Sequence, residues 1–85
     1  MPELSRFYGI VIYINPRDHL PPHFHAEYGE HEAAVEIATG AVLAGHLPSR
    51  AWRLVQEWFD LHRAEVEENW RLIQGGRRFF RIEPL

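Results

Sequence analysis

The 85-residue sequence contains no cysteine and no lysine, and its nine side-chain cations are all arginines. Without cysteine, disulfide bonds, thiolate nucleophiles, zinc–thiolate sites and iron–sulfur clusters are excluded. Without lysine, Schiff-base chemistry is excluded as well. Apart from tyrosine, the only hydroxyl side chains are Ser5, Thr39 and Ser49. Nucleophilic catalysis therefore has few candidate residues.

The sequence also has no long apolar run. The longest, Gly9 to Ile14, is far shorter than the roughly 20 residues of a transmembrane helix. Residues 1–30 lack the basic region followed by an apolar region that marks a signal peptide. Hydrophobic residues make up 46% of the chain and charged residues 25%, which is a globular composition. We expect one cytoplasmic domain, residues 1–85, with no membrane association.

Alternation of apolar residues and turn signals predict a mostly antiparallel sheet. Residues 6–14 are aromatic and β-branched, which predicts one central strand. The stretch from His23 to Ile37 has Gly29-Glu30 at its middle, which predicts a hairpin with a type II′ turn and Tyr28 paired with His31. The remaining predicted strands are residues 41–43 and residues 77–82, the latter beside the first strand.

Helical spacing of apolar residues begins after Pro48 and ends at Gly75-Gly76. A straight helix over residues 49–74 would be about 40 Å long, against a radius of gyration of about 12 Å for a domain of this size. We therefore expect a bend or break near residues 62–65. The predicted fold class is α+β, with an antiparallel sheet of about five strands packed on one side by one bent helix or two short C-terminal helices.

The predicted hairpin places a chemically distinctive row on one face. His23, His25 and Glu27 alternate along one strand, and Glu36 lies across from His23. Imidazole and carboxylate ligands suit zinc, nickel, manganese or iron, and two histidines with one carboxylate leave coordination positions open for substrate. The preceding loop supplies further ligands. The candidate ligands of a divalent transition metal are His19, His23, His25, Glu27 and Glu36, with Asp18 as an alternative to His19.

The same row has two other interpretations. His23, His25 and Glu27 fit an acid–base catalyst that needs no metal, and they also fit a solvent-facing strand of ordinary cross-strand neighbours. No cofactor is therefore certain from the sequence. In the first helical turn, Arg50 and Arg53 either pair with glutamates or form an anion site with free backbone amides.

Two features suggest a partner surface. Trp52 lies off the apolar stripe of the helix, so it is a candidate exposed anchor for another protein. Charge is unevenly divided: residues 18–49 contain five acids and no arginine, whereas residues 71–81 contain four arginines and no acid. Such polarity can orient a partner. The net charge of −3 argues against a dedicated nucleic-acid binder.

Several short motifs along the chain carry a family resemblance. They are Arg6-Phe7-Tyr8-Gly9-Ile10, Asp18-His19, Pro21-Pro22-His23-Phe24-His25-Ala26-Glu27-Tyr28, Leu47-Pro48, Trp58, Leu61-His62, Asn69-Trp70 and Ile82-Glu83-Pro84-Leu85. With these motifs the sequence resembles the bacterial family called domain of unknown function 4160. Members are often encoded beside a second small protein, of domain of unknown function 2442, in a layout similar to a toxin–antitoxin pair.

The resemblance implies a component of a toxin–antitoxin-like two-gene module that acts through a small protein partner encoded nearby. Self-association into a homo-oligomer is a further option. The alternative from the residues is a metal-dependent or acid–base hydrolase or nuclease centred on His23, His25 and Glu27. A transcriptional regulator, a label given to some members, is the second alternative, although no helix shows a basic recognition face.

Overall fold

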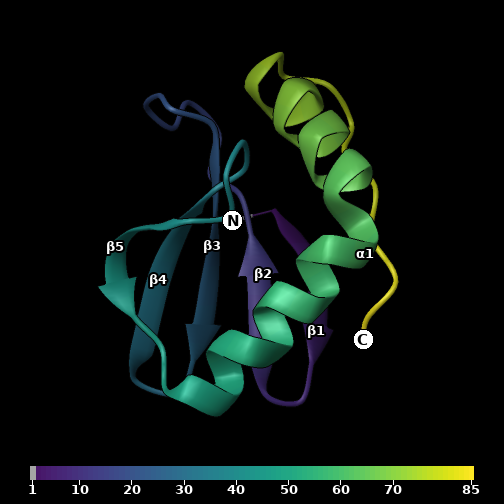
Figure 1. The fold of residues 1–85 in the computed structure, drawn as a ribbon. Coiled ribbons are helices and arrows are strands. Elements are labelled where there is room, and N and C mark those ends of the chain that lie inside the picture. Colours follow the sequence, from purple (N-terminus) through teal and green to yellow (C-terminus); the bar gives the residue numbers. More distant parts are fainter. Residues whose placement is uncertain (1) are drawn as a thin grey trace.

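The chain forms five strands followed by one long helix, and the computed structural model describes residues 2–85 (Figure 1). The strands pair antiparallel in sequence order, β1 to β5, which makes the sheet a simple meander. The α+β class is therefore confirmed. The elements are β1 (Glu3–Phe7), β2 (Ile10–Tyr13), β3 (His23–Tyr28), β4 (His31–Glu36), β5 (Val42–His46) and α1 (Ser49–Gln74).

The first predicted strand is in fact a hairpin. Tyr8 and Gly9 both have positive φ, 49° and 82°, and they connect β1 to β2 with Phe7 paired to Ile10. Two consecutive positive φ values are typical of a type I′ turn, whose twist matches that of the flanking strands. The prediction of one continuous strand over residues 6–14 was wrong because apolar residues continue through both strands and mask the turn.

The central hairpin has the predicted register. Tyr28 pairs with His31 and His23 pairs with Glu36, and Gly29 at the turn has a φ of 59°. Glu30 does not share this positive φ, as expected for a type II′ turn with glycine first. The register sends Phe24, Ala26, Ala33 and Val35 into the core. The row that begins with His23 and His25 lies on the opposite face.

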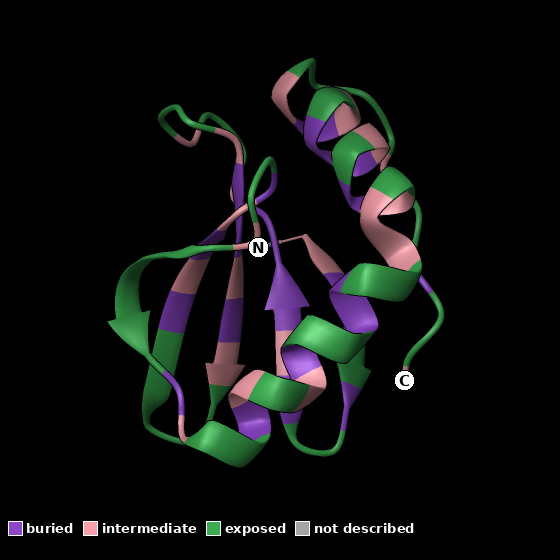
Figure 2. Cartoon of the chain, viewed as in Figure 1, coloured by how far each residue is buried: buried purple, intermediate pink, exposed green. Residues whose placement is uncertain are grey.

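Helix α1 kinks at His62, where φ is −127° and ψ is 22°, as the length argument predicted. Its buried face contributes Val55, Trp58 and Phe59 to the same hydrophobic core as the sheet. The Trp58 ring lies 5.7 Å from the Phe7 ring, and Figure 2 shows the buried face of the helix turned toward the sheet. No helix within residues 2–85 is long and apolar enough to cross a membrane.

Residues 77–85 form no strand, which corrects the prediction of one at residues 77–82. The segment does lie beside β1, since the Ile82 N–H donates to the Leu4 carbonyl at 2.8 Å. Three of its backbone groups pair with side chains: Asn69 binds the Phe80 N–H and carbonyl, and the Trp58 indole donates to the Glu83 carbonyl. Side chains of α1 thus take the place of part of the ladder that a sixth strand would form.

Candidate metal centre

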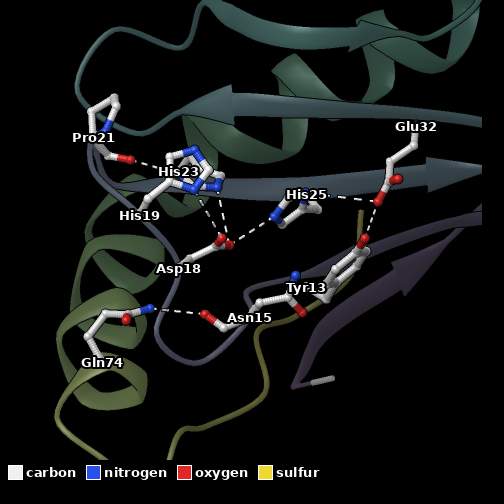
Figure 3. Close-up of polar contacts among 9 residues, drawn as sticks. All are labelled: Tyr13, Asn15, Asp18, His19, Pro21, His23, His25, Glu32 and Gln74. Carbon is white, nitrogen blue, oxygen red and sulfur yellow. Dashed lines mark hydrogen bonds and ion pairs between the residues drawn. The ribbon is translucent and has the colours of Figure 1, made fainter.

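Three side chains of metal-ligand type meet at the start of β3 (Figure 3). Asp18, from the loop between β2 and β3, places its Oδ2 atom 3.2 Å from His23 Nε2 and 3.0 Å from His25 Nε2. One potential ligand atom from each of the three residues lies within 4.8 Å of the others. The two rings therefore point at a single carboxylate oxygen.

The local fold explains this convergence. His23 and His25 are two residues apart on β3, so their side chains leave the same face of the sheet. Asp18 reaches them because the loop folds back over that face, and the Gln74 side-chain amide holds the Asn15 carbonyl at 3.0 Å. Asp18 is largely shielded from solvent, and the His23 side chain is only 3% exposed.

A backbone contact constrains the protons of His23. Its Nδ1 atom lies 2.8 Å from the Pro21 carbonyl oxygen. Because a carbonyl can only accept a hydrogen bond, Nδ1 must donate. In the neutral ring, Nε2 then presents a lone pair to a carboxylate oxygen 3.2 Å away. Two acceptors at this distance need either a metal ion or a proton between them, carried by the ring or by the carboxyl group.

His25 is oriented by a second set of groups. Its ring stacks on Tyr13 with centroids 4.8 Å apart, and its Nδ1 atom lies 3.9 Å from Glu32 Oε2. The Tyr13 hydroxyl donates to Glu32. Burial and the nearby Glu32 carboxylate raise the pKa of Tyr13 above its usual value, so the phenol keeps its proton. Metal-binding imidazoles usually hydrogen-bond a carboxylate through the second ring nitrogen; Glu32 lies on that side of His25, at a distance longer than a hydrogen bond.

The separations suit a small transition-metal ion. Zinc binds imidazole nitrogen and carboxylate oxygen at about 2.0–2.2 Å in tetrahedral geometry, which puts ligand atoms about 3.3 Å apart. The Nε2 to Oδ2 distances at Asp18, 3.0 and 3.2 Å, are within a few tenths of an ångström of that edge. Two of the three ligand–ligand separations of the cluster thus already match those around such an ion, and all three are within 4.8 Å.

Not all the ligands predicted from the sequence join the cluster. His19 lies next to it, with Nδ1 3.7 Å from Asp18 Oδ1 and a ring that is 85% exposed. Glu27 lies further along β3, paired with Glu32 of β4. Glu36 is across from His23 as predicted, but its carboxylate accepts a hydrogen bond from Thr39 at 2.6 Å. The cluster comprises Asp18, His23 and His25.

The residues suggested for anion and partner binding lie elsewhere. Arg50 and Arg53 are exposed in the first turns of α1, whose first turn contains no acidic residue. Arg50 lines a surface cavity with Tyr8 and Tyr28. Trp52 is partly buried and packs against the hydrophobic core, so it offers less surface to a partner than a fully exposed ring would.

Sequence reasoning missed Tyr13 and Glu32 as supporting residues. Tyr13 was counted among the apolar residues of a single strand, although its pairing with His25 across β2 and β3 makes it a neighbour of the cluster. The predicted register of the hairpin pairs Glu32 with Glu27 and so puts it on the histidine face, which is a usable signal. A supporting role for either residue becomes visible only once the pairing of β2 with β3 is known.

Together, the meander sheet and its cluster define a small α+β protein with two histidines and one carboxylate converging at one end of the sheet. The chain belongs to the family described as Domain of unknown function (DUF4160), whose family model matches residues 9–71. The match includes all three residues of the cluster, and it confirms the resemblance seen in the sequence. Comparisons with curated proteins and with solved structures gave no match.

Proposed function

We propose that Asp18, His23 and His25 bind a divalent transition-metal ion and that the protein is a metal-dependent hydrolase. The observation that carries the proposal is the convergence of two Nε2 atoms on one Asp18 oxygen, at 3.0 and 3.2 Å, while Nδ1 of His23 is committed to the Pro21 carbonyl. This leaves the His23 lone pair aimed at the centre of the cluster.

The ligand set favours a transition metal over calcium or magnesium, which prefer ligand sets made only of oxygen. Two imidazoles with one carboxylate bind zinc, manganese, iron or nickel and leave coordination positions for water and substrate. A bound ion would supply an activated water at neutral pH. The exposed imidazole of His19, beside Asp18, is in a position to exchange protons with a substrate on the solvent side.

Charge around the cluster favours a neutral or cationic substrate over nucleic acid. Asp18, Glu32 and Glu36 surround the histidines or flank them, and residues 18–49 contain no arginine. A phosphodiester backbone would be repelled by these carboxylates, whereas nucleic-acid sites are normally basic. Of the possible hydrolases, we therefore favour one that acts on uncharged or basic substrates over a nuclease.

The competing explanation is a structural ion pair in which the imidazoles are protonated and donate to Asp18. Metal titration separates the two. Zinc, manganese and nickel are titrated calorimetrically into protein stripped with chelator, beside the double variant His23→Ala/His25→Ala. His31→Ala/His46→Ala is the matched control, since that pair of rings lies 6.1 Å apart on β4 and β5, outside the cluster.

We expect saturable binding of one ion per chain in wild type and in the control, and none in His23→Ala/His25→Ala. A wild-type protein that binds none of the three ions would contradict the proposal. Loss of metal binding in His31→Ala/His46→Ala, with binding retained in His23→Ala/His25→Ala, would place the site at His31 and His46 instead. Cobalt substitution adds a direct readout, because its visible spectrum reports nitrogen and oxygen ligation.

Action through a protein partner in a two-gene module stays a prediction from the family resemblance, as does the regulator alternative. Co-purification with the product of the neighbouring reading frame tests the first. Binding to the DNA upstream of the gene pair tests the second.

A further inference from the structure

The two edges of the sheet differ in how they are covered. At β1, the Leu4 carbonyl accepts a hydrogen bond from Ile82, and Arg81 pairs with Glu3 at 3.1 Å, so the C-terminal segment lies along that edge. At the other edge, β5 pairs with β4 alone among the described residues. All five residues of β5 are exposed, and Figure 2 shows the strand exposed along its length, away from the helix.

Strand β5 lacks most features that normally block an open edge. Native edge strands are protected by charged residues, proline or bulges, because their free N–H and C=O groups otherwise pair with other chains. Val42–His46 contains no acid, arginine, lysine or proline. A register shift leaves Leu43 between the pairs of Val42 and Ala44, and Leu43 is 45% exposed. The stretch from Ala44 to His46 continues in regular register.

The surface beside this edge has a shallow hollow with one carboxylate, Glu32. Glu32, with its side chain 48% exposed, lines a cavity with His25 and with the small residues Ala34, Ala44 and Gly45. No larger residue fits at position 45 without movement of the strands, because a Cβ atom there would lie 2.1 Å from the Glu32 carbonyl oxygen. The small side chains leave room for a long side chain that reaches toward the Glu32 carboxylate from beyond β5.

From these features we infer that β5 accepts an extended, basic segment of a partner protein as a sixth strand. Backbone hydrogen bonds to the open edge supply affinity, and an arginine or lysine of the added strand passes over Ala44 of β5 toward Glu32, the β4 residue opposite His46. A second copy of this chain is the poorer occupant. The β5 strand of a second copy, Val42–His46, contains no arginine or lysine, so it would leave Glu32 without a cationic partner.

The test uses short synthetic peptides of alternating valine and arginine. Every second amide is N-methylated, so that one edge can pair with β5 while the other cannot self-associate. A glutamate–valine peptide is the charge control, and an arginine–valine peptide methylated on both edges is the pairing control. Binding is measured calorimetrically in chelator, which makes the result independent of any metal at Asp18, and hydrogen exchange reports protection of the β5 amides.

We expect the basic peptide to bind saturably, to slow exchange within Val42–His46, and to bind at least about tenfold more tightly than either control. Leu43→Lys should weaken this binding about tenfold through charge repulsion at the edge. The matched control is Leu61→Lys, at an exposed position of α1, and should leave binding unchanged.

Three results would overturn the inference. The first is no binding of the basic peptide. The second is equal binding of the acidic peptide or of the doubly methylated one. The third is a dimer of the protein alone, seen by sedimentation, that Leu43→Lys dissociates, because the occupant of the edge would then be a second copy.

Discussion

Asn69 and Phe80 form a closed pair of hydrogen bonds: the Asn69 amide donates to the Phe80 carbonyl at 2.9 Å, and the Phe80 N–H donates to Asn69 Oδ1 at 3.0 Å. Asn69 is fully buried, so its side chain satisfies both backbone groups of Phe80 where a strand partner would otherwise do so. Together with the Trp58 indole, which donates to the Glu83 carbonyl, this side chain holds the C-terminal segment in its path along β1.

Replacing Asn69 with leucine should release that segment. Two hydrogen bonds are lost and the partly buried groups of Phe80 are left unpaired, which costs about 2–3 kcal/mol of the free energy of unfolding. Urea denaturation measures the loss, and amide exchange at Phe80 shows whether it is local. Gln56→Leu, at an exposed position of the same helix, is the control. Unchanged exchange at Phe80 in Asn69→Leu would contradict the role assigned to the asparagine.

Gly29 and Gly45 both have positive φ, 59° and 80°, but they differ in surroundings. A Cβ atom at Gly29 meets nothing within 4 Å, whereas one at Gly45 meets the Glu32 carbonyl. Gly29→Ala should therefore cost about 1 kcal/mol of stability from the backbone conformation alone. Gly45→Ala should cost more, about 3 kcal/mol, because β5 must also move away from β4. Paired chemical melts check the order, and equal losses would contradict the close approach of the two strands.

The raised pKa of Tyr13 predicts a pH dependence of stability. In the unfolded chain tyrosine loses its proton near pH 10, whereas in the folded protein burial and Glu32 hold the proton to higher pH. The folded state then binds more protons than the unfolded state, so stability must fall as pH rises above about 10. Below that pH the contribution is fully present.

Comparison of wild type with Tyr13→Phe isolates this effect from other groups. The free energy of unfolding of wild type should fall more steeply above about pH 10 than that of Tyr13→Phe. Tyr8→Phe, at an exposed turn position, should keep the wild-type slope. If Tyr13→Phe shows the same slope as wild type, Tyr13 titrates normally and its hydrogen bond to Glu32 is absent in solution.

The sequence predicted the part of the site that local rules determine. A turn glycine at position 29 fixes the hairpin register, and the register places His23 and His25 on one face. The kink near His62 followed from length alone. These predictions needed no knowledge of distant contacts, because the alternation of a strand and the length of a helix can be read from one continuous stretch of sequence.

Elements held by distant contacts were not predictable in the same way. The position of Asp18 depends on a loop fixed by Gln74, which lies 59 residues from Asn15 in the sequence. The C-terminal segment is held by Asn69 and Trp58 rather than by a strand ladder, so its alternating pattern was misleading. In both places a side-chain hydrogen bond to the backbone determines the path of the chain. The periodicity of apolar residues in the sequence gives no sign of such a bond.

The most discriminating substitution at the cluster is Asp18→Asn. If His23 is neutral in the metal-free protein, an asparagine amide can donate to the lone pair of its Nε2 atom, which removes the clash between two acceptors. The metal-free variant should then be as stable as wild type or more stable by about 1 kcal/mol, while its metal affinity falls. If the cluster is instead an ion pair of protonated imidazoles with Asp18, the same change removes the carboxylate that contacts both rings and should destabilise the protein by a similar amount or more. Thermal melts in chelator, followed by zinc titration of the same samples, distinguish the two. A destabilised Asp18→Asn whose wild-type parent binds no zinc would support the ion pair and rule out a zinc site.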